Sequence, residues 1–318
     1  MNIFIEFSER VAIFQLYLCS MNIKAWLSAF RLRTLPLSLS GIILGTAIAA
    51  AQGYFLPIVF GLALTTTVLF QIVSNLANDL GDSQKGTDNE HRVGPKRTVQ
   101  SGAISMNQMK NAVILFSILS LASASLLIFY SAQNLSLQSI YFYLLLALLC
   151  VAAAIMYTVG KMAYGYNGFG DAMVFVFFGL VSVLGVFTLY TNYIDPLNFL
   201  PGTAIGFLST AVLNLNNMRD IENDRASKKN TLVVVIGPKK AKIYHYFLIS
   251  GAFFSLAMFL FISQNHLAMI GLLPFILLFN HLIKVKNISE AKEFDPELKK
   301  VALSTFAIAL LTSVGLFL

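Results

Sequence analysis

The sequence predicts an all-α membrane protein with nine transmembrane helices. Of its 318 residues, 57% are hydrophobic and only 12% are charged, whereas a soluble domain carries about 25% charged residues. The mean hydropathy is +0.74. Apolar runs recur along the chain at about 20 residues, the length that a helix needs to cross a bilayer. Together these observations favour one helical bundle over two soluble domains.

Each predicted span is an apolar run that ends at polar or charged residues. The nine spans are residues 35–53, 55–78, 109–131, 138–159, 172–190, 200–218, 243–262, 267–284 and 301–318. Four spans follow charged or Gly-rich stretches: the first follows RLRT, the fifth GFGD, the seventh KKAK and the ninth ELKK. Three spans end at polar residues: the second at NLAND, the sixth at NNMRD and the eighth at Lys284. A short polar loop joins the third and fourth spans.

The basic residues predict the orientation. The connections after the first, third, fifth and seventh spans carry no Lys or Arg, so all 22 basic residues fall on one side. By the positive-inside rule that side is cytoplasmic. We therefore expect a multi-pass protein of the inner cell membrane, with its N-terminus and charged loops in the cytoplasm and its C-terminus outside. The net charge of +7 is explained in this way and does not indicate nucleic acid.

The first 23 residues precede the predicted bundle. They have no basic leading region and no small-residue cleavage site, so they do not read as a signal peptide. We expect residues 1–23 to be an N-terminal extension or an interfacial helix, with translation starting at Met1 or Met21. Residues 24–318 are expected to form a single transmembrane domain of two related four-helix units plus a ninth helix.

Two acidic clusters end the second and sixth spans. Asn75, Asp79 and Asp82 follow one another at helical spacings, and Asn216, Asp220 and Asp224 do the same. One such cluster alone is equally well explained as a solvated helix end or as acids paired with nearby bases. Carboxylates at membrane helix ends are costly unless they are paired or functional. Two clusters on one side of the membrane therefore favour a functional site.

The chemistry of these clusters indicates a magnesium-bridged diphosphate. Mg²⁺ prefers a few carboxylates together with phosphate oxygens, and neither cluster contains the His or Cys typical of zinc sites. Basic side chains beside the acids are suited to binding phosphate; they are Lys85, Arg92, Arg97, Arg219, Arg225 and Lys228. A diphosphate above a hydrophobic bundle indicates an isoprenoid lipid substrate, whose departing diphosphate the site would stabilise.

At these residues the sequence resembles the UbiA superfamily of intramembrane aromatic prenyltransferases. The family's first motif matches Asn78, Asp79, Asp82 and Asp88, and its second matches Asp220 and Asp224. Three further stretches, RLRTLPLSLSGIILGTA, GTDNEHRVGPKRTVQSG and YTVGKMAYGYNGFGDAMVFVFFG, resemble the naphthoate branch. The sequence departs from the pattern at Gly86, where many relatives have the third acid, and at Asp171, where that branch is expected to have Glu.

The resemblance implies a nine-helix bundle around a central cavity that transfers a prenyl group with Mg²⁺ as cofactor. It implies polyprenyl diphosphate and 1,4-dihydroxy-2-naphthoate as substrates, with decarboxylation to demethylmenaquinone, and contact with membrane lipid. The predicted catalytic residues are Asp79, Asp82, Asp220 and Asp224, and the predicted metal ligands are these four with Asp88. The predicted substrate-binding residues are Asn75, Asn78, Lys85, Arg92, Arg97, Tyr157, Lys161, Asp171, Asn216, Arg219, Arg225 and Lys228.

Other functions remain open at this point. The acceptor could instead be 4-hydroxybenzoate or homogentisate. A transporter is a more remote alternative, because it predicts ionisable residues near the middle of spans, whereas here they gather at one face. The Gly-rich run 160–171 fits neither common nucleotide-binding motif. Residues 288–300 read as a surface helix or linker without chemistry.

Overall fold

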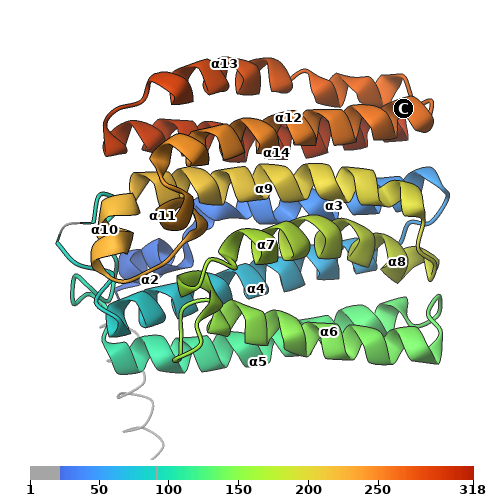
Figure 1. Cartoon of the computed structure of the whole chain (residues 1–318). Helices are drawn as coiled ribbons and strands as arrows, with labels where there is room; N and C mark the ends of the chain where they lie inside the picture. The colour runs from blue at the N-terminus through green and yellow to red at the C-terminus, as the bar shows by residue number, and fades with distance from the viewer. Residues whose placement is uncertain (1–21, 91) are drawn as a thin grey trace, which may run out of the picture.

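The computed structural model is an all-helical bundle, as the sequence predicts. It describes residues 22–90 and 92–318, so the predicted extension over residues 1–23 lies almost entirely outside it. Nine helical segments in the described part of the chain are long and apolar enough to cross a membrane, which confirms the predicted number. They run side by side along one axis (Figure 1).

The helices have the following bounds: α2 (Ile23–Phe30), α3 (Leu35–Ala51), α4 (Pro57–Gln84), α5 (Met106–Ser131), α6 (Leu137–Met156), α7 (Gly170–Val174), η3 (Phe175–Gly185), α8 (Val186–Thr191), α9 (Phe199–Arg219), α10 (Ile221–Ala226), α11 (Leu232–Ile236), α12 (Pro238–Ile262), α13 (Phe275–Asn287) and α14 (Phe294–Phe317). Short 3₁₀ turns complete the order: η1 (Leu32–Thr34), η2 (Tyr164–Tyr166), η4 (Pro196–Asn198), η5 (Leu267–Leu272) and η6 (Ala291–Glu293).

Local sequence signals explain where several helices begin. Proline occupies the first turn of α3, α4 and α12, where its missing N–H has no intrahelical partner to lose. The Ser105 hydroxyl accepts a hydrogen bond from the Gln108 amide at 3.3 Å, and the Gln108 side chain accepts one from the Ser105 amide at 2.9 Å. This reciprocal capping box begins α5. The Ser136 and Thr231 side chains cap α6 and α11 in a similar way.

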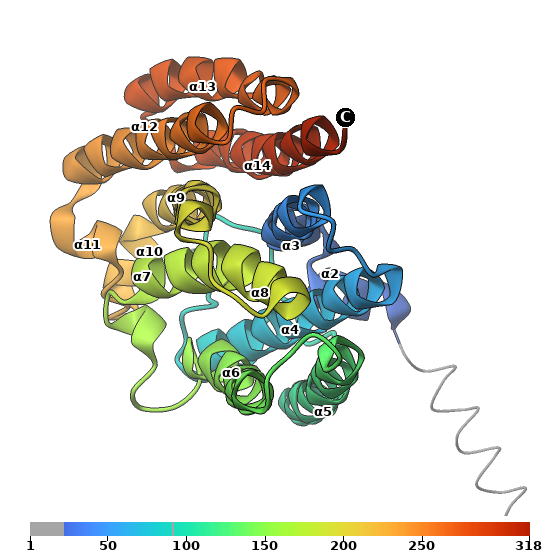
Figure 2. The ribbon, with the colours of Figure 1, turned by 90° about the vertical axis from the view of Figure 1, so that its right-hand side faces the viewer.

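The helices pack around a large central core, and α2, α4 and α5 share a second, smaller apolar cluster. Viewed along the axis, α12, α13 and α14 form a layer against α3 and α9, while α4 to α8 lie on the other side of these two helices (Figure 2). One cluster of buried apolar residues extends from Ile42 on α3 to Ala309 on α14. The division into two related four-helix units and a ninth helix stays a prediction.

Small residues let the central helices approach closely, which is typical of helix packing in membranes. An added Cβ at Gly179 would lie 2.5 Å from the Gly202 carbonyl oxygen and from the Gly206 Cα. An added Cβ at Gly45 would lie 2.4 Å from the Val183 carbonyl oxygen. The fifth span is therefore held against both α3 and α9 by close backbone contact.

That fifth span is not a uniform α-helix. Its central part, η3, is an 11-residue π-helical segment, a geometry that is rare and is often found at functional sites. The Ser182 hydroxyl donates a hydrogen bond to the Gly179 carbonyl oxygen at 3.0 Å and another to that of Phe178. Phe177, Phe178 and Val181 from this segment line the cavity described below.

The predicted boundaries are corrected at both acidic clusters. Helix α4 continues to Gln84, six residues past its predicted end, so Asp82 lies within the helix. The sixth span ends at Arg219, and Asp220 is a junction residue with φ −96° and ψ 10°, after which α10 begins. The backbone amide of Asp224 still donates to the Asp220 carbonyl oxygen at 2.8 Å, so one turn separates these two acids.

Candidate active site

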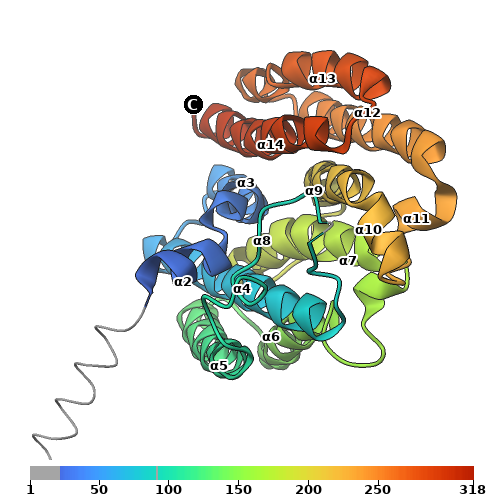
Figure 3. The same cartoon turned by 90° about the vertical axis from the view of Figure 1, so that its left-hand side faces the viewer.

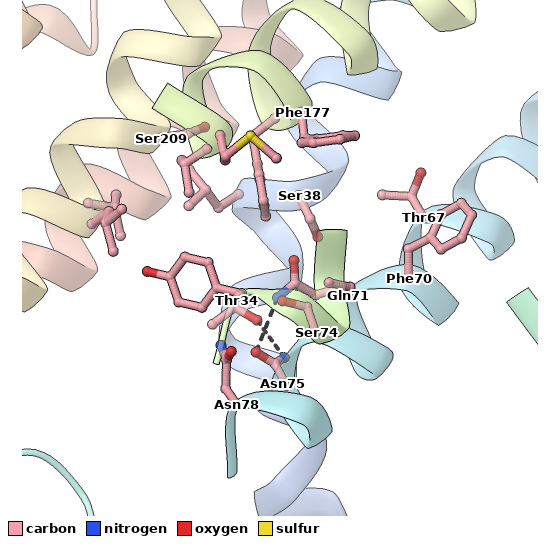
Figure 4. A pocket seen from close by; sticks show the side chains of 18 of the residues that line it. Thr34, Ser38, Thr67, Phe70, Gln71, Ser74, Asn75, Asn78, Phe177 and Ser209 are labelled. Carbon is pink, nitrogen blue, oxygen red and sulfur yellow. Dashed lines mark hydrogen bonds between the residues drawn. The ribbon is translucent and has the colours of Figure 1, made fainter. Parts of the chain in front are cut away.

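A cavity of about 910 Å³ runs through the bundle from one end. We call this the charged end; α4 and α9 finish there, and α10 lies beside it (left in Figure 1). Near this end polar side chains line the cavity, among them Thr34, Gln71 and Asn75 (Figure 4). Deeper in, its walls are apolar and include Leu127 on α5 and Leu189 on α8. The cavity thus combines a polar entrance with a long hydrophobic interior.

The acids of α4 are fixed by polar contacts. The Asn75 amide donates to the Phe30 carbonyl oxygen at 2.9 Å and to the Thr34 hydroxyl at 3.3 Å, which ties α4 to the start of α3. Asp79, one turn further on, accepts hydrogen bonds from the Arg31 guanidinium and, at 3.2 Å, from the Thr98 hydroxyl. Only 1% of Asp79 is exposed, so its charge is balanced by Arg31 within the protein.

Asp82 belongs to a second group of contacts. The Tyr166 hydroxyl donates to Asp82 Oδ1 at 2.7 Å, and Lys229 Nζ lies 3.4 Å from the same oxygen. The Tyr166 hydroxyl also bonds with the Thr87 hydroxyl at 2.6 Å, and Lys85 Nζ lies 3.9 Å from the centre of the Tyr166 ring. One tyrosine therefore connects the end of α4 with two cationic side chains.

Asp220 on the opposite side is held by arginine. The Arg219 guanidinium donates to both Asp220 oxygens, at 2.9 and 2.6 Å, and to Asn216 Oδ1 at 2.8 Å. It also donates to Asp295 Oδ1 at 2.6 Å. Arg92 lies 3.8 Å from Asp220. Each of the three guanidinium nitrogens of Arg219 thus donates to a carboxylate, and one of them also to the Asn216 side chain.

Two further acids are buried with fewer hydrogen bonds or cations to stabilise their charge. Burial, together with the nearby Asp82, raises the pKa of Asp88 to about 6, although Arg92 at 3.4 Å opposes this shift. Within the described part of the chain, neither Asp88 oxygen accepts a hydrogen bond. Burial likewise raises the pKa of Asp224 to about 7, although Lys229 opposes this shift. Such carboxylates are costly to ionise unless a cation joins them.

One arginine is also destabilised in its charged form. Burial, together with the neighbouring Arg31 and Arg92, lowers the pKa of Arg97 to about 9. The attraction of Asp79, whose Oδ1 lies 3.7 Å from Arg97 Nε, only partly offsets this. Since a guanidinium is normally charged under all conditions, this position favours an additional anion.

The donor set suits Mg²⁺, which prefers hard oxygen ligands from one or two carboxylates together with phosphate. In residues 22–90 and 92–318, no three acids, His or Cys lie close enough together to hold a metal unaided. Instead, guanidinium and ammonium groups lie against Asp79, Asp82 and Asp220. These cations are the partners that a metal ion would have to replace at the acids.

Most predicted site residues do line this cavity or contact an acid that does. The lining residues are Asn75, Asn78, Asp82, Arg92, Arg97, Tyr157, Asn216, Arg219, Asp220 and Asp224. Asp79 and Asp88 lie directly behind them, paired with Arg97. Burial raises the pKa of the Tyr157 hydroxyl, so it stays protonated at the cavity wall.

Five predicted substrate-binding residues lie away from the cavity. Lys161 and Lys228 are exposed, and Arg225 is exposed and paired with Glu222 at 3.3 Å. Asp171 is buried at the start of α7, where its carboxylate bonds with Tyr244. Lys85 contacts the Tyr166 ring instead of the cavity. The substrate-binding roles of these five residues stay predictions; in this structure their side chains lie at the surface or in packing contacts.

Other residues at the site were not predicted. Arg31 and Arg33 were explained as positive-inside residues, yet both line the cavity. Lys229 takes the place expected for Lys228, since Lys228 has a left-handed backbone with φ 56°. Asp295 lies in the segment predicted to be a plain surface helix, yet it lines the cavity and binds Arg219. Pairing across such sequence distances leaves no local signal.

Comparison with known proteins agrees with this geometry. The model of the UbiA prenyltransferase family matches residues 38–296. The chain belongs to the UbiA prenyltransferase family. This confirms the resemblance inferred from the motifs, and with it the expected fold.

Two curated relatives match this UbiA family member over nearly their whole length. A 1,4-dihydroxy-2-naphthoate octaprenyltransferase of Escherichia coli K12 is 42% identical over 296 residues, which cover 93% of this chain and 96% of the relative. A protein of the same name from Haemophilus influenzae is 41% identical over 303 residues, covering 93% and 97%.

Solved structures of UbiA homologues share the fold. A homologue from Aeropyrum pernix superimposes with a TM-score of 0.64 at 17% identity, covering 89% of this chain and 96% of that one. A homologue from Archaeoglobus fulgidus, described as bound to GPP and Mg²⁺, gives a TM-score of 0.63 at 17% identity, covering 91% and 98%.

Proposed function

We propose that this protein transfers a polyprenyl group from polyprenyl diphosphate to 1,4-dihydroxy-2-naphthoate, giving demethylmenaquinone in its reduced, quinol form, together with diphosphate and carbon dioxide. The observation that supports this most directly is the 42% identity with a relative of that name over 93% of the chain. The cavity supports it independently, because paired acids and bases lie at its entrance and its interior is apolar and long.

In this proposal the two acidic clusters hold Mg²⁺ through Asp79, Asp82, Asp220 and Asp224, with Asp88 behind them. The metal would supply positive charge to the diphosphate oxygens as the bond to the allylic carbon breaks. A homologue of the same fold is described as bound to Mg²⁺ and GPP, which supports this assignment.

The arginines of this site have a defined role in the proposed reaction. When Asp220 binds metal, Arg92 and Arg219 lose a carboxylate partner and can donate to the diphosphate instead. Bound by these arginines and by the metal that the acids would hold, the leaving group would depart without being protonated. The allylic carbon then bonds to the acceptor ring carbon that carries the carboxylate, and the ring regains its electron pair as carbon dioxide leaves.

The orientation follows from the same reasoning. We propose that the protein lies in the inner cell membrane. Its charged end would face the cytoplasm, because the Lys and Arg residues gather at that end. The soluble acceptor and the released diphosphate would then enter and leave on the cytoplasmic side, while the prenyl chain lies along Leu127, Leu189 and their neighbours.

Product analysis with several acceptors tests the proposal. Purified protein in phosphatidylcholine vesicles would receive Mg²⁺, polyprenyl diphosphate and equal amounts of 1,4-dihydroxy-2-naphthoate, 4-hydroxybenzoate and homogentisate. We expect mass spectrometry to detect only the decarboxylated naphthoate product, and Asp79→Asn to abolish it. Prenylation of another acceptor in preference to the naphthoate would overturn the substrate, and wild-type rates for Asp79→Asn would overturn the metal site.

A further inference from the structure

A second pocket of about 330 Å³ lies at the charged end, outside the cavity. It is bounded by α2 and η1 on one side and by residues 95–98 on the other; Figure 3 shows α2 beside α4 at this end of the bundle. Four cationic side chains line it: Arg31, Arg33, Lys96 and Arg97. Among the described residues that line it there is no Asp or Glu. This pocket is therefore suited to an anion.

The four cationic side chains differ in the ion pairs and hydrogen bonds that they form. Arg33 and Lys96 are exposed, and in the part of the chain that the structure describes neither forms an ion pair. Arg31 and Arg97 both lie beside Asp79, but the Nε atom of each is buried and donates no hydrogen bond to any described residue. Buried donors without acceptors are costly, so a bound anion would be stabilised by all four.

The position of α2 indicates where that anion comes from. One face of α2 packs on α4 through Ala25 and Ala29, which are 7% and 1% exposed. Ile23 and Leu27 are 63% and 48% exposed, as is Leu32 just beyond the helix at 45%. A short amphipathic helix with such a face lies at the level of lipid headgroups. The pocket thus lies where headgroup phosphates are concentrated.

We propose that this pocket binds the headgroup phosphate of an anionic phospholipid, and that the bound lipid draws Arg31 and Arg97 away from Asp79. Both arginines line this pocket and the active-site cavity, so they form the wall between the two. A phosphate on one side competes with the Asp79 carboxylate on the other. Basic pockets at the cytoplasmic side of membrane helices commonly bind acidic lipids.

The consequence is a link between lipid and metal. Asp79 becomes free to bind Mg²⁺ when Arg31 turns to the lipid phosphate, so each ligand strengthens the binding of the other. Only this second step rests on the proposed metal function. Lipid binding itself does not depend on any reaction.

The chain provides a reporter for lipid binding. Trp26 on α2 is the single tryptophan of the sequence; it is half-buried and directly precedes Leu27, which lines the pocket. Its fluorescence would be measured in phosphatidylcholine vesicles containing increasing fractions of brominated phosphatidylglycerol or brominated phosphatidylcholine. We expect half-maximal quenching at an at least fivefold lower fraction of the brominated phosphatidylglycerol. Equal quenching by both lipids would overturn the proposal.

A matched pair of variants assigns that preference to the pocket. Lys96 lines only this pocket, whereas Lys240 is an exposed lysine on α12 that lines neither cavity. One lysine near an acidic headgroup contributes a factor of about five in affinity. We expect Lys96→Gln to lower the preference for phosphatidylglycerol by that factor and Lys240→Gln to leave it unchanged. Equal losses in both variants would show general surface attraction and overturn the assignment.

Two further experiments complete the test. The first distinguishes a free phosphate ion from a lipid headgroup as the ligand, and the second tests whether lipid binding strengthens Mg²⁺ binding. If millimolar pyrophosphate, added without metal, displaced brominated phosphatidylglycerol from Trp26, the pocket would be a free-phosphate site and the lipid assignment would be overturned. In transfer assays, phosphatidylglycerol should lower the half-saturating Mg²⁺ concentration about fivefold in wild type but not in Lys96→Gln. An unchanged Mg²⁺ requirement would overturn the coupling. Absence of transfer in every lipid would instead contradict the proposed function and leave the fluorescence result standing.

Discussion

Removal of the Tyr166 hydroxyl tests how the site positions Asp82. This hydroxyl donates to Asp82 at 2.7 Å and bonds with Thr87 at 2.6 Å, while the Tyr166 carbonyl oxygen accepts from the Asn230 amide at 3.1 Å. Tyr166 thus connects α4, the α6–α7 loop and the loop after α10. Tyr166→Phe keeps the ring, its contact with Lys85 and the backbone bond, and removes only the hydroxyl.

The expected size of the effect follows from the negative charge of Asp82, which accepts this hydrogen bond. A hydrogen bond to a charged group is worth about 1.5–3 kcal/mol, which corresponds to roughly 10- to 150-fold in an equilibrium constant. Because Asp82 is a proposed metal ligand, we expect the KM for polyprenyl diphosphate and the half-saturating Mg²⁺ concentration to rise within that range. The KM for the acceptor should change little, since Tyr166 does not line the cavity.

Initial rates in vesicles, with one substrate varied at a time, measure these constants. Tyr246→Phe is the matched control, because the Tyr246 hydroxyl donates at 2.8 Å to the Leu282 carbonyl oxygen, away from the acids. It should show wild-type constants. The reasoning is refuted if Tyr166→Phe stays within twofold of wild type, or if both variants lose diphosphate affinity equally.

Three other predictions concern the metal, the packing and the channel. Asp220→Asn should lower transfer at least 100-fold while retaining the fold, measured as initial rate and melting temperature; a near-normal rate contradicts its role as ligand. Gly179→Ala should lower unfolding stability by about 1–3 kcal/mol, because overpacking strains the backbone contact, whereas Gly185→Ala, whose Cβ would meet only Val181 at 3.9 Å, should not. In a Cys19→Ser background, polyprenyl diphosphate should slow alkylation of Cys150, which lines the cavity, by an apolar maleimide; an unchanged rate would place the prenyl chain elsewhere.

The sequence predicted the fold well because the dominant signal is local. A run of about 20 apolar residues is sufficient to predict a span, and all nine predicted runs correspond to helices. The boundaries were less accurate where a helix continues into polar residues. Helix α4 runs on to Gln84, and the ninth helical segment begins at Ala291, ten residues before its predicted start.

The site was predicted only in part, for a physical reason. The acids repeat at helical spacings, so their convergence could be inferred from the sequence. Their partners come from elsewhere: Arg31 is 48 residues from Asp79, and Asp295 is 76 residues from Arg219. Such contacts depend on how α2, α4, α9 and α14 pack, and no periodicity encodes that arrangement.

The ion pairs of this site also make the binding of metal and the binding of diphosphate depend on each other. A lone Mg²⁺ at Asp220 would displace Arg219, of which 3% of the side chain is exposed, and would leave a buried guanidinium with one carboxylate fewer. A diphosphate without metal would meet acids that repel it. Either ligand alone would therefore bind weakly. When both bind, the metal neutralises the acids and the diphosphate neutralises the arginines. The site should therefore bind metal and diphosphate cooperatively, as one unit, and hold free magnesium only weakly.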